Sequence, residues 1–523
     1  MDTKVLRQKV LDLAIRGKLV PQDPNDEPAS VLLERIRQQK QQMVKDGKLK
    51  AKDIKNDTII FVSEDNLHYE KFADGSVKCI EDEIPFELPD GWAWSRLGAV
   101  AEAIGDGDHQ PPPQTSFGVP FLVISNVSGG RLSFENTRFV SKEYFSQLPE
   151  TRKPRNGDLL FTVTGSYGIP VLIDSDDKFC FQRHIAIVRP CTISNRYLYV
   201  ILGSSYVKSI CDAKATGTAQ KTVGLATLRE LLIPVAPYKE QMQIYAQTQD
   251  ALSIVDSVSS DKEDLLNIIE SAKTKILDLA IRGQLVPQDP TDEPASVLLE
   301  RIRAEKEELI KQGKIKRDKK ESVIFRGEDN SYYLRTGELV ESLEDWDFEE
   351  LPDGWSVCCL GELCDYGNCT NIDTADIADS AWILDLEDIE KDSGIVLQKV
   401  RQGERNAGST KHRFHKGQVL YSKLRPYLNK VVLADEDGYC TSEILPLEFD
   451  RNILPQYARY FLMSPTFLRY ANKCSYGVKM PRLGTTDGKK AIIPVPPVKE
   501  QKRIVMAIEL AFAKLASITE HLT

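Results

Sequence analysis

The chain has 523 residues, of which 41% are hydrophobic and 28% are charged, and its formal net charge is -10 at pH 7. This composition is typical of a soluble globular protein of several domains, and no apolar run approaches the roughly 18 residues of a membrane-spanning helix. The acidic total excludes a protein coated in positive charge, although local basic patches remain possible. Met1-Asp2-Thr3-Lys4 leads into an amphipathic helix instead of a secretory signal, so we expect a cytoplasmic protein.

Two stretches near the start and the middle of the chain are almost the same. Residues 11–37 and 277–303 differ only at Lys18/Gln284 and Asn25/Thr291. In each copy a helix is expected to end at a glycine, Gly17 or Gly283, and a second helix to follow the motif DEP. Copies that stay this similar are expected to make the same contact twice.

Each copy is followed by a lysine-rich run and then by a region of mixed structure. The lysine-rich runs, residues 38–55 and 304–320, are interpreted as solvated helix ends and linkers. The motif LPDGW at residues 88–92 and 351–355 then begins two regions with short β-type runs between turn residues. Both regions end in a similar motif, at residues 233–241 and 493–501. Glycine, cysteine and tyrosine positions align between them at an offset of 260, so one scaffold is expected to carry two different surfaces.

Residues 238–283 show the apolar spacing of a long helix that packs along another helix. The seam from Ile504 to Leu522 matches the first half of this helix, and Leu6, Val10 and Leu13 match its second half. We therefore expect an α/β (α+β) protein in which two similar domains are joined by a long antiparallel two-helix coiled-coil spine, with pseudo-two-fold symmetry.

This plan divides the chain into five parts. They are a helical region and connector at 1–87, a first domain at 88–237, a central helical region and connector at 238–347, a second domain at 348–497, and a spine helix at 498–523.

Sites for catalysis or metal binding find little support. No GxxxxGK[ST] motif is present, and the paired prolines lack the flanking residues of an amino-methyltransferase site. Asp106-Gly-Asp-His109 is interpreted as a shaped loop rather than a catalytic dyad. Cys358, Cys359, Cys364 and Cys369 have poor zinc spacing and are expected to be reduced thiols, and His412 with His415 is assigned to a basic surface instead of a metal site.

Local charge is more informative than motifs. Residues 401–430 contain eight Lys or Arg residues and one acid, Glu404, interleaved with hydrogen-bonding side chains. This pattern indicates a nucleic-acid surface. An ordinary solvated surface remains an alternative for any single residue. For the 401–430 cluster as a whole it is the weaker interpretation.

Taken together, the chain resembles the specificity subunit of type I restriction-modification enzymes. The resemblance rests on both LPDGW motifs, both closing motifs, Asp106-Gly-Asp-His109 with Pro112-Pro113 and residues 118–122, Gln182-Arg-His184 with residues 185–187, and residues 417–425. It implies a non-catalytic DNA reader of a bipartite site in a complex that methylates adenine. It also implies two methyltransferase subunits, which bind S-adenosylmethionine, and two restriction subunits, which use ATP and Mg. No cofactor is expected in this chain.

These patterns give a set of candidate residues. The DNA-binding candidates are His109, Gln110, Arg131, Gln182, Arg183, His184, Gln220 and Lys221 in the first domain, and Lys411, Arg413, Ser422, Lys423, Arg425, Tyr427, Lys479 and Arg482 in the second. The candidates for docking methyltransferase subunits are Leu32, Leu33, Leu298 and Leu299, for which packing inside the protein is an equally open role. Two other functions remain as alternatives: a stand-alone DNA-modifying enzyme or nuclease, and a scaffold that binds only proteins.

Overall fold

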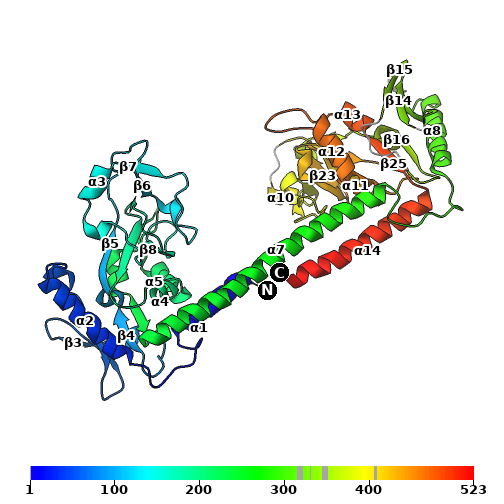
Figure 1. The fold of residues 1–523 in the computed structure, drawn as a ribbon. Coiled ribbons are helices and arrows are strands. Elements are labelled where there is room, and N and C mark those ends of the chain that lie inside the picture. Colours follow the sequence, from blue (N-terminus) through cyan, green and yellow to red (C-terminus); the bar gives the residue numbers. More distant parts are fainter. Residues whose placement is uncertain are drawn as a thin grey trace. The chain divides into compact units, whose positions relative to one another are not determined.

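The computed structural model describes residues 2–218, 220–314, 322–329, 331–343, 351–405 and 409–522. The chain divides into two compact units that meet within one helix, at residues 261 and 262. Unit 1 is residues 2–261 and unit 2 is residues 262–522, and each is described by itself (Figure 1). Among the described residues, no helix combines the length and the apolar character needed to cross a membrane.

Unit 1 begins with helices and a small sheet and continues into a mixed α/β domain. Its elements are α1 (Thr3–Ile15), α2 (Ala29–Lys45), β1 (Ile59–Val62), β2 (His68–Lys71), β3 (Val77–Cys79), β4 (Ala93–Arg96), β5 (Ala101–Asp106), β6 (Val119–Leu122), β7 (Arg138–Val140), α3 (Lys142–Gln147), β8 (Leu159–Thr162), β9 (Pro170–Leu172), β10 (Cys180–Phe181), β11 (Ile185–Pro190), α4 (Asn195–Leu202), α5 (Ser205–Lys214), α6 (Leu225–Glu230), β12 (Leu232–Val235) and the first part of α7 (Tyr238–Ile281).

The core of unit 1 lies between a four-stranded sheet and helices. The sheet has the order β5-β11-β8-β9, and β11 is antiparallel to both of its neighbours. Leu159, Phe161, Ala186 and Val188 face a core shared with α1, α2, α4 and α7. The other face of the sheet supports a second core with the β10-β6-β7 sheet. Because β8 and β11 are buried on both faces, they consist of continuous apolar runs rather than alternating ones.

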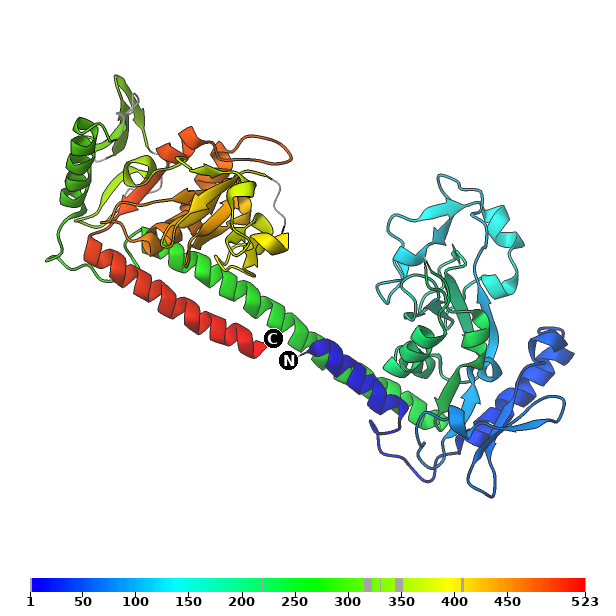
Figure 2. The ribbon, with the colours of Figure 1, turned by 180° about the vertical axis from the view of Figure 1, so that it is seen from behind.

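The two predicted helices of the first repeat are present, and α1 lies antiparallel to the first part of α7 (Figure 2). Thr3 contacts Ser259, Arg7 forms an ion pair with Asp256, and Leu11 and Ile15 share a core with Ile244 and Leu252. α7 itself runs without interruption for 44 residues, as expected for residues 238–283.

The connector after the lysine-rich run 38–55 folds into a three-stranded antiparallel sheet, β1-β2-β3. Glu70 of β2 is buried and accepts from Arg96 of β4 at 2.7 Å, which joins the small sheet to the domain. Lys40 is an exception to the solvated interpretation of that run. It is buried, and its Nζ pairs with Asp57 at 2.6 Å.

Unit 2 follows the same plan. Its elements are the last part of α7, α8 (Ala295–Lys311), β13 (Ser322–Arg326), β14 (Tyr332–Thr336), β15 (Leu339–Ser342), β16 (Ser356–Cys359), α9 (Leu360–Leu363), β17 (Asn371–Ile372), β18 (Trp382–Leu384), β19 (Val400–Arg401), α10 (Gln402–Arg405), β20 (Lys411–Phe414), β21 (Val419–Ser422), β22 (Val431–Leu433), β23 (Gly438–Thr441), β24 (Ile444–Leu447), α11 (Pro455–Met463), α12 (Pro465–Cys474), α13 (Thr485–Lys490), β25 (Ile492–Val495) and α14 (Val498–Leu522).

The core of unit 2 is formed by the β22-β21-β24 sheet, helices α11 and α12, and both long helices. Leu277 and Ile281 of α7 share it with Ile504 and Ile508 of α14. A five-stranded sheet, β17-β20-β23-β18-β19, carries a second core around Trp382 and Phe414. The expected boundary at residues 347/348 lies outside the described residues.

The repeated motifs contact one another in the same way in the two units. The indole Nε1 of Trp92, from the first LPDGW, donates to Glu240 at the start of α7 at 3.0 Å. In unit 2, Trp355 donates to Glu500 of α14 at 3.1 Å. Gly17 has φ of +64°, and a Cβ there would lie 2.4 Å from Pro89. A glycine therefore ends α1 both because its backbone is left-handed and because LPDGW packs against it.

Candidate nucleic-acid interface

In unit 1, three separate segments meet at one end of β8. The amide of Val163 donates to His184 O at 2.9 Å, and the amide of Val223 donates to Val163 O at 2.8 Å. Gly165 donates to Lys221 O at 3.1 Å. The third segment, residues 216–222, is closed at its base by reciprocal bonds between Thr216 and Thr222 at 3.0 and 2.8 Å. We call this arrangement the frame, and residues 216–222 the frame loop of unit 1.

Unit 2 contains the corresponding frame about 260 residues later. The amide of Lys423 donates to Glu443 O at 3.0 Å, and that of Leu483 donates to Lys423 O at 3.0 Å. Arg425 donates to Pro481 O at 2.7 Å, as Gly165 does to Lys221. Tyr476 and Arg482 close the base of the frame loop of unit 2, residues 476–482, with bonds of 3.1 and 2.9 Å. The same backbone scaffold is therefore built twice from different side chains.

Most of the first-domain candidates lie at the frame of unit 1. Gln220 and Lys221 are exposed on the frame loop, and the Gln182 side chain contacts His184 Nδ1 at 3.1 Å. Burial, and secondarily the charge of Arg183, lowers the pKa of His184, which favours the neutral imidazole. The segment of His109 joins this group, because Arg183 donates its amide to Asp108 O at 3.1 Å.

The remaining two candidates of the first domain have a weaker connection. Gln110 is exposed beside His109, whose Nε2 lies 2.9 Å from Asp106. Arg131 is exposed in the loop before β7, and no contact among the described residues joins it to the frame. Asp106 and Asp108 both pair with Arg152, at 3.9 and 3.4 Å, so their charges are partly neutralised.

In unit 2, the frame gathers four of the candidates and assigns two others to structural roles. Lys423, Arg425 and Tyr427 follow β21 directly, and Lys479 is exposed on the frame loop. Arg482 binds Glu443 through Nη2 at 2.8 Å and Nε at 3.0 Å, so it holds the loop in place. Ser422 is buried and donates to Leu424 O at 3.0 Å, which makes it part of the interior instead of a DNA contact.

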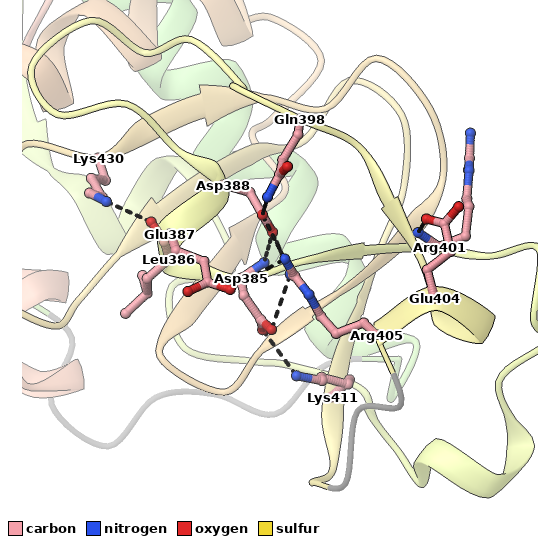
Figure 3. A network of polar contacts seen from close by, with 10 residues as sticks. All are labelled: Asp385, Leu386, Glu387, Asp388, Gln398, Arg401, Glu404, Arg405, Lys411 and Lys430. Carbon is pink, nitrogen blue, oxygen red and sulfur yellow. Dashed lines mark hydrogen bonds and ion pairs between the residues drawn. The ribbon is translucent and has the colours of Figure 1, made fainter. Parts of the chain in front are cut away.

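Three of the eight basic residues at 401–430, Arg401, Arg405 and Lys411, are neutralised by ion pairs, which corrects the interpretation of Lys411 (Figure 3). Lys411 is buried, and its Nζ pairs with Asp385 at 3.0 Å. Arg405 pairs with Asp385 at 3.1 Å and with the buried Asp388. Burial acts to raise the pKa of Asp388, but the hydrogen bonds from Arg405, the Asp385 amide and Gln398, together with the charge of Arg405, hold that pKa below its ordinary value. Lys411 therefore stabilises the fold, because buried charges need partners.

Arg413 also lies apart from the frame. It is exposed on β20 between the buried His412 and Phe414. Alternation along a strand places Arg413 on the same face as Lys411, whereas His412 on the other face lies 2.9 Å from Ile444 O. Among the described residues no ion pair involves Arg413, Lys423, Arg425 or Lys479. They are the candidate cations of unit 2 that remain available to a phosphate.

Three of the four leucines proposed for partner docking are buried, which favours the alternative role of packing inside the protein. Leu32 is 1% exposed in the core of unit 1, and Leu298 and Leu299 are buried in the core of unit 2. Leu33 is partly buried against the same core as Leu32. These side chains form the apolar stripes of α2 and α8, and such stripes are covered by the helix's own domain.

The structure also shows residues that the sequence patterns missed. Tyr476, Val478 and Met480 are exposed on the frame loop of unit 2, and Glu443 holds that loop. The offset of 260 would have paired these three positions with Thr216, Thr218 and Gln220.

In the part of the chain that the structure describes, no group of three or more His, Cys, Asp or Glu residues could hold a metal ion. Cys358 and Cys364 are buried free thiols, and burial raises their pKa values. His412 is buried, which corrects its assignment to a basic surface, and the exposed His415 lies 3.1 Å from Asp437.

Comparisons with known proteins also find two similar segments in this chain. A family model described as the type I restriction modification DNA specificity domain matches residues 89–267 and 352–522. The EcoAI specificity subunit of Escherichia coli is 31% identical over 70% of this chain and 63% of its own length. The EcoEI specificity subunit of Escherichia coli is 29% identical over 69% and 61%. The chain thus spans less than two thirds of either relative.

The chain is also similar to a solved structure, the HsdS subunit from Thermoanaerobacter tengcongensis. The identity is 17%, the TM-score is 0.44, and the match covers 84% of this chain and 93% of that one. The family model, by contrast, matches more than half of the 523 residues in two segments, of which the first lies in unit 1 except for its last six residues and the second lies in unit 2. The chain therefore belongs to the family of proteins with type I restriction modification DNA specificity domains.

Proposed function

We propose that this chain is the non-catalytic DNA-reading subunit of a type I restriction-modification complex, and that each unit reads one half of a bipartite site. The observation that carries the proposal is the repeated frame, which has the same backbone bonds but different side chains in the two units. A rigid scaffold that presents variable side chains suits direct readout, because base edges in the major groove are distinguished by the donors, acceptors and methyl groups they meet.

Because the two units present side chains of different chemistry, we expect the two half-sites to differ in sequence instead of forming a symmetric site. Unit 1 presents Gln182, Arg183, Gln220 and Lys221, whereas unit 2 presents Lys423, Arg425, Tyr427 and Lys479. In both units the backbone of the frame is closed on itself by hydrogen bonds, so DNA is contacted by side chains rather than by free backbone groups.

Partner subunits are also part of the proposal. Two methyltransferase subunits, with S-adenosylmethionine, would dock on the repeated segments 11–37 and 277–303. Two restriction subunits, with ATP and Mg, would complete a cytoplasmic complex. The matching surface consists of exposed residues: Val31 is 44% exposed and Val297 is 42% exposed. Beside them, Arg35 binds Glu27 at 2.6 Å and Arg301 binds Glu293 at 2.7 Å, so both copies present the same pattern.

We further infer that α7, with α1 and α14, forms an antiparallel spine with pseudo-two-fold symmetry that sets the distance between half-sites. A continuous helix of 44 residues spans roughly 66 Å at about 1.5 Å per residue. The apolar seam that repeats in the first and last helices supports this pairing.

The test is assembly of the full chain with its methyltransferase partner, followed by footprinting. We expect two protected half-sites separated by unread base pairs, together with no cleavage or methylation by the chain alone in single-turnover assays. Activity of the chain alone would favour an enzyme. Absence of any sequence-selective footprint in the complex would favour a scaffold that binds only proteins.

A further inference from the structure

The two frame loops have corresponding closing bonds at the base and opposite tip chemistry. Both turn at a glycine with positive φ, +110° at Gly217 and +101° at Gly477. A Cβ at Gly217 would lie 2.5 Å from Gln220 O, so the tight turn requires a glycine. The described residues of the two loops therefore share a glycine turn and corresponding closing bonds at the base.

Three alternate positions of the loops differ in the same direction. Positions 216, 218 and 220 are Thr, Thr and Gln in unit 1. The corresponding residues in unit 2 are Tyr476, Val478 and Met480, which are 63%, 101% and 44% exposed. Hydrogen-bonding side chains are thus replaced by apolar or aromatic ones at every second residue. Single exposed apolar residues are common on protein surfaces, but three that project from one short loop mark a binding site.

The apolar loop is held firmly and lies among cations. Glu443 binds the guanidinium of Arg482 at the base of the loop at 2.8 Å, and Arg425 donates its amide to Pro481 O at 2.7 Å. Lys479 lies between the two apolar tip residues, and Lys423 and Arg425 belong to the adjoining segment. Positive charge around a projecting apolar tip is complementary to a polyanion that displays methyl groups. The major groove of DNA presents the C5-methyl group of thymine between two rows of phosphates.

We propose that unit 2 reads its half-site through contacts of Val478 and Met480 with thymine methyl groups, whereas unit 1 reads its half-site through hydrogen bonds from Thr218 and Gln220. This inference rests on the proposed function, because it names the chemistry by which each unit recognises DNA. Gln side chains suit the N6 and N7 groups of adenine, which gives the two loops different base preferences.

The test uses the complex with its methyltransferase partner and duplexes carrying the target found by methylation mapping. Thymines are replaced by deoxyuridine, which lacks only the methyl group, in one half-site at a time. We expect weaker binding for one half-site only, by about fourfold for each methyl group contacted. The double variant Val478→Ser/Met480→Gln should bind the natural duplex and the duplex with deoxyuridine in the half-site of unit 2 with equal affinity. The matched control Thr218→Ser/Gln220→Ala should retain the sensitivity to deoxyuridine.

Each outcome decides one point. Equal affinity of the wild-type complex for thymine and deoxyuridine duplexes would overturn the inference, while selective binding of the natural target would still support the proposed function. A half-site of unit 2 without any A·T pair, or deoxyuridine sensitivity that persists in the double variant, would overturn it as well. No preference of the complex for its mapped target would overturn the proposed function itself.

Discussion

Arg425 offers a test in which stability and DNA affinity are expected to change in opposite directions. It has a left-handed backbone with φ of +49°, and the corresponding residue of unit 1 is Gly165, with φ of +72°. Its Nε is buried and has no hydrogen-bond partner. Arginine at this position is therefore unfavourable for the fold, and strain of this kind is concentrated at functional sites.

The variant Arg425→Gly removes the strain. A left-handed conformation costs about 1–2 kcal/mol for a residue other than glycine, whereas glycine costs about 0.5–1 kcal/mol through the entropy of the unfolded chain. We expect the free energy of unfolding to be unchanged or higher by up to about 1.5 kcal/mol. Loss of a base contact should weaken DNA binding by about 1–3 kcal/mol. Arg425→Lys is the control, since it keeps the strain and the charge.

The assay combines urea unfolding of the full chain with DNA titrations of the complex. If Arg425→Gly lowered the free energy of unfolding by more than 1 kcal/mol, the claim of strain would be wrong. If the variant bound DNA as the wild type does, Arg425 would have no role in readout.

The remaining predictions concern charge, the domain core, partner docking and the long helix. Lys479→Ala should reduce the slope of affinity against salt by about 0.9 if it contacts a phosphate, whereas Lys411→Met should lower stability and leave that slope unchanged. Trp92→Phe and Trp355→Phe should each cost about 1–3 kcal/mol in urea unfolding, because a buried carboxylate loses its donor. Burial raises the pKa of Glu240 and of Glu500, so the folded state holds their protons more tightly than the unfolded state does. The free energy of unfolding should therefore fall as the pH rises past their ordinary pKa of 4.5. A urea midpoint that stays constant as the pH rises above 4.5 would contradict this prediction. Val31→Asp should remove one methyltransferase subunit in native mass spectrometry, as should Val297→Asp, and an intact assembly in both would exclude this surface. Four residues inserted near Ser259 to Lys262 add roughly 6 Å, which should lengthen the unread spacer by one or two base pairs of about 3.4 Å each; an unchanged spacer in methylome sequencing would exclude α7 as the ruler.

The repeated plan of the fold could be predicted from the sequence because it depends on local patterns. The apolar seam gave α7 to within a few residues, and the strands expected around Leu159 and Val419 are present as β8 and β21. The offset of 260 aligned Gly217 with Gly477, which have the same positive φ in the two frame loops. Periodicity and turn residues act over short distances, so they are visible in a single chain.

The incorrect predictions concern residues whose role depends on contacts with residues far away in the sequence. The charge of Lys411 is neutralised by Asp385, 26 residues upstream and outside the basic segment. The apolar spacing of α2 predicted a buried face, but it did not indicate whether the chain or a partner covers Leu32. The hydrogen bond between Trp92 and Glu240 joins motifs that are 148 residues apart, and only the folded chain shows that these two residues are in contact.

Methylome sequencing of cells that express the complete system tests the central claim most directly, which is that each unit reads one half of a bipartite site. The wild type and a variant of the unit 2 frame, Arg425→Gly with Lys479→Ala, are compared with a variant of the unit 1 frame, Gln220→Ala with Lys221→Ala. We predict a bipartite motif in which each variant relaxes one half and leaves the other half unchanged, with a different half affected in each case. Relaxation of the same half, or of both halves, by the two variants would contradict the account.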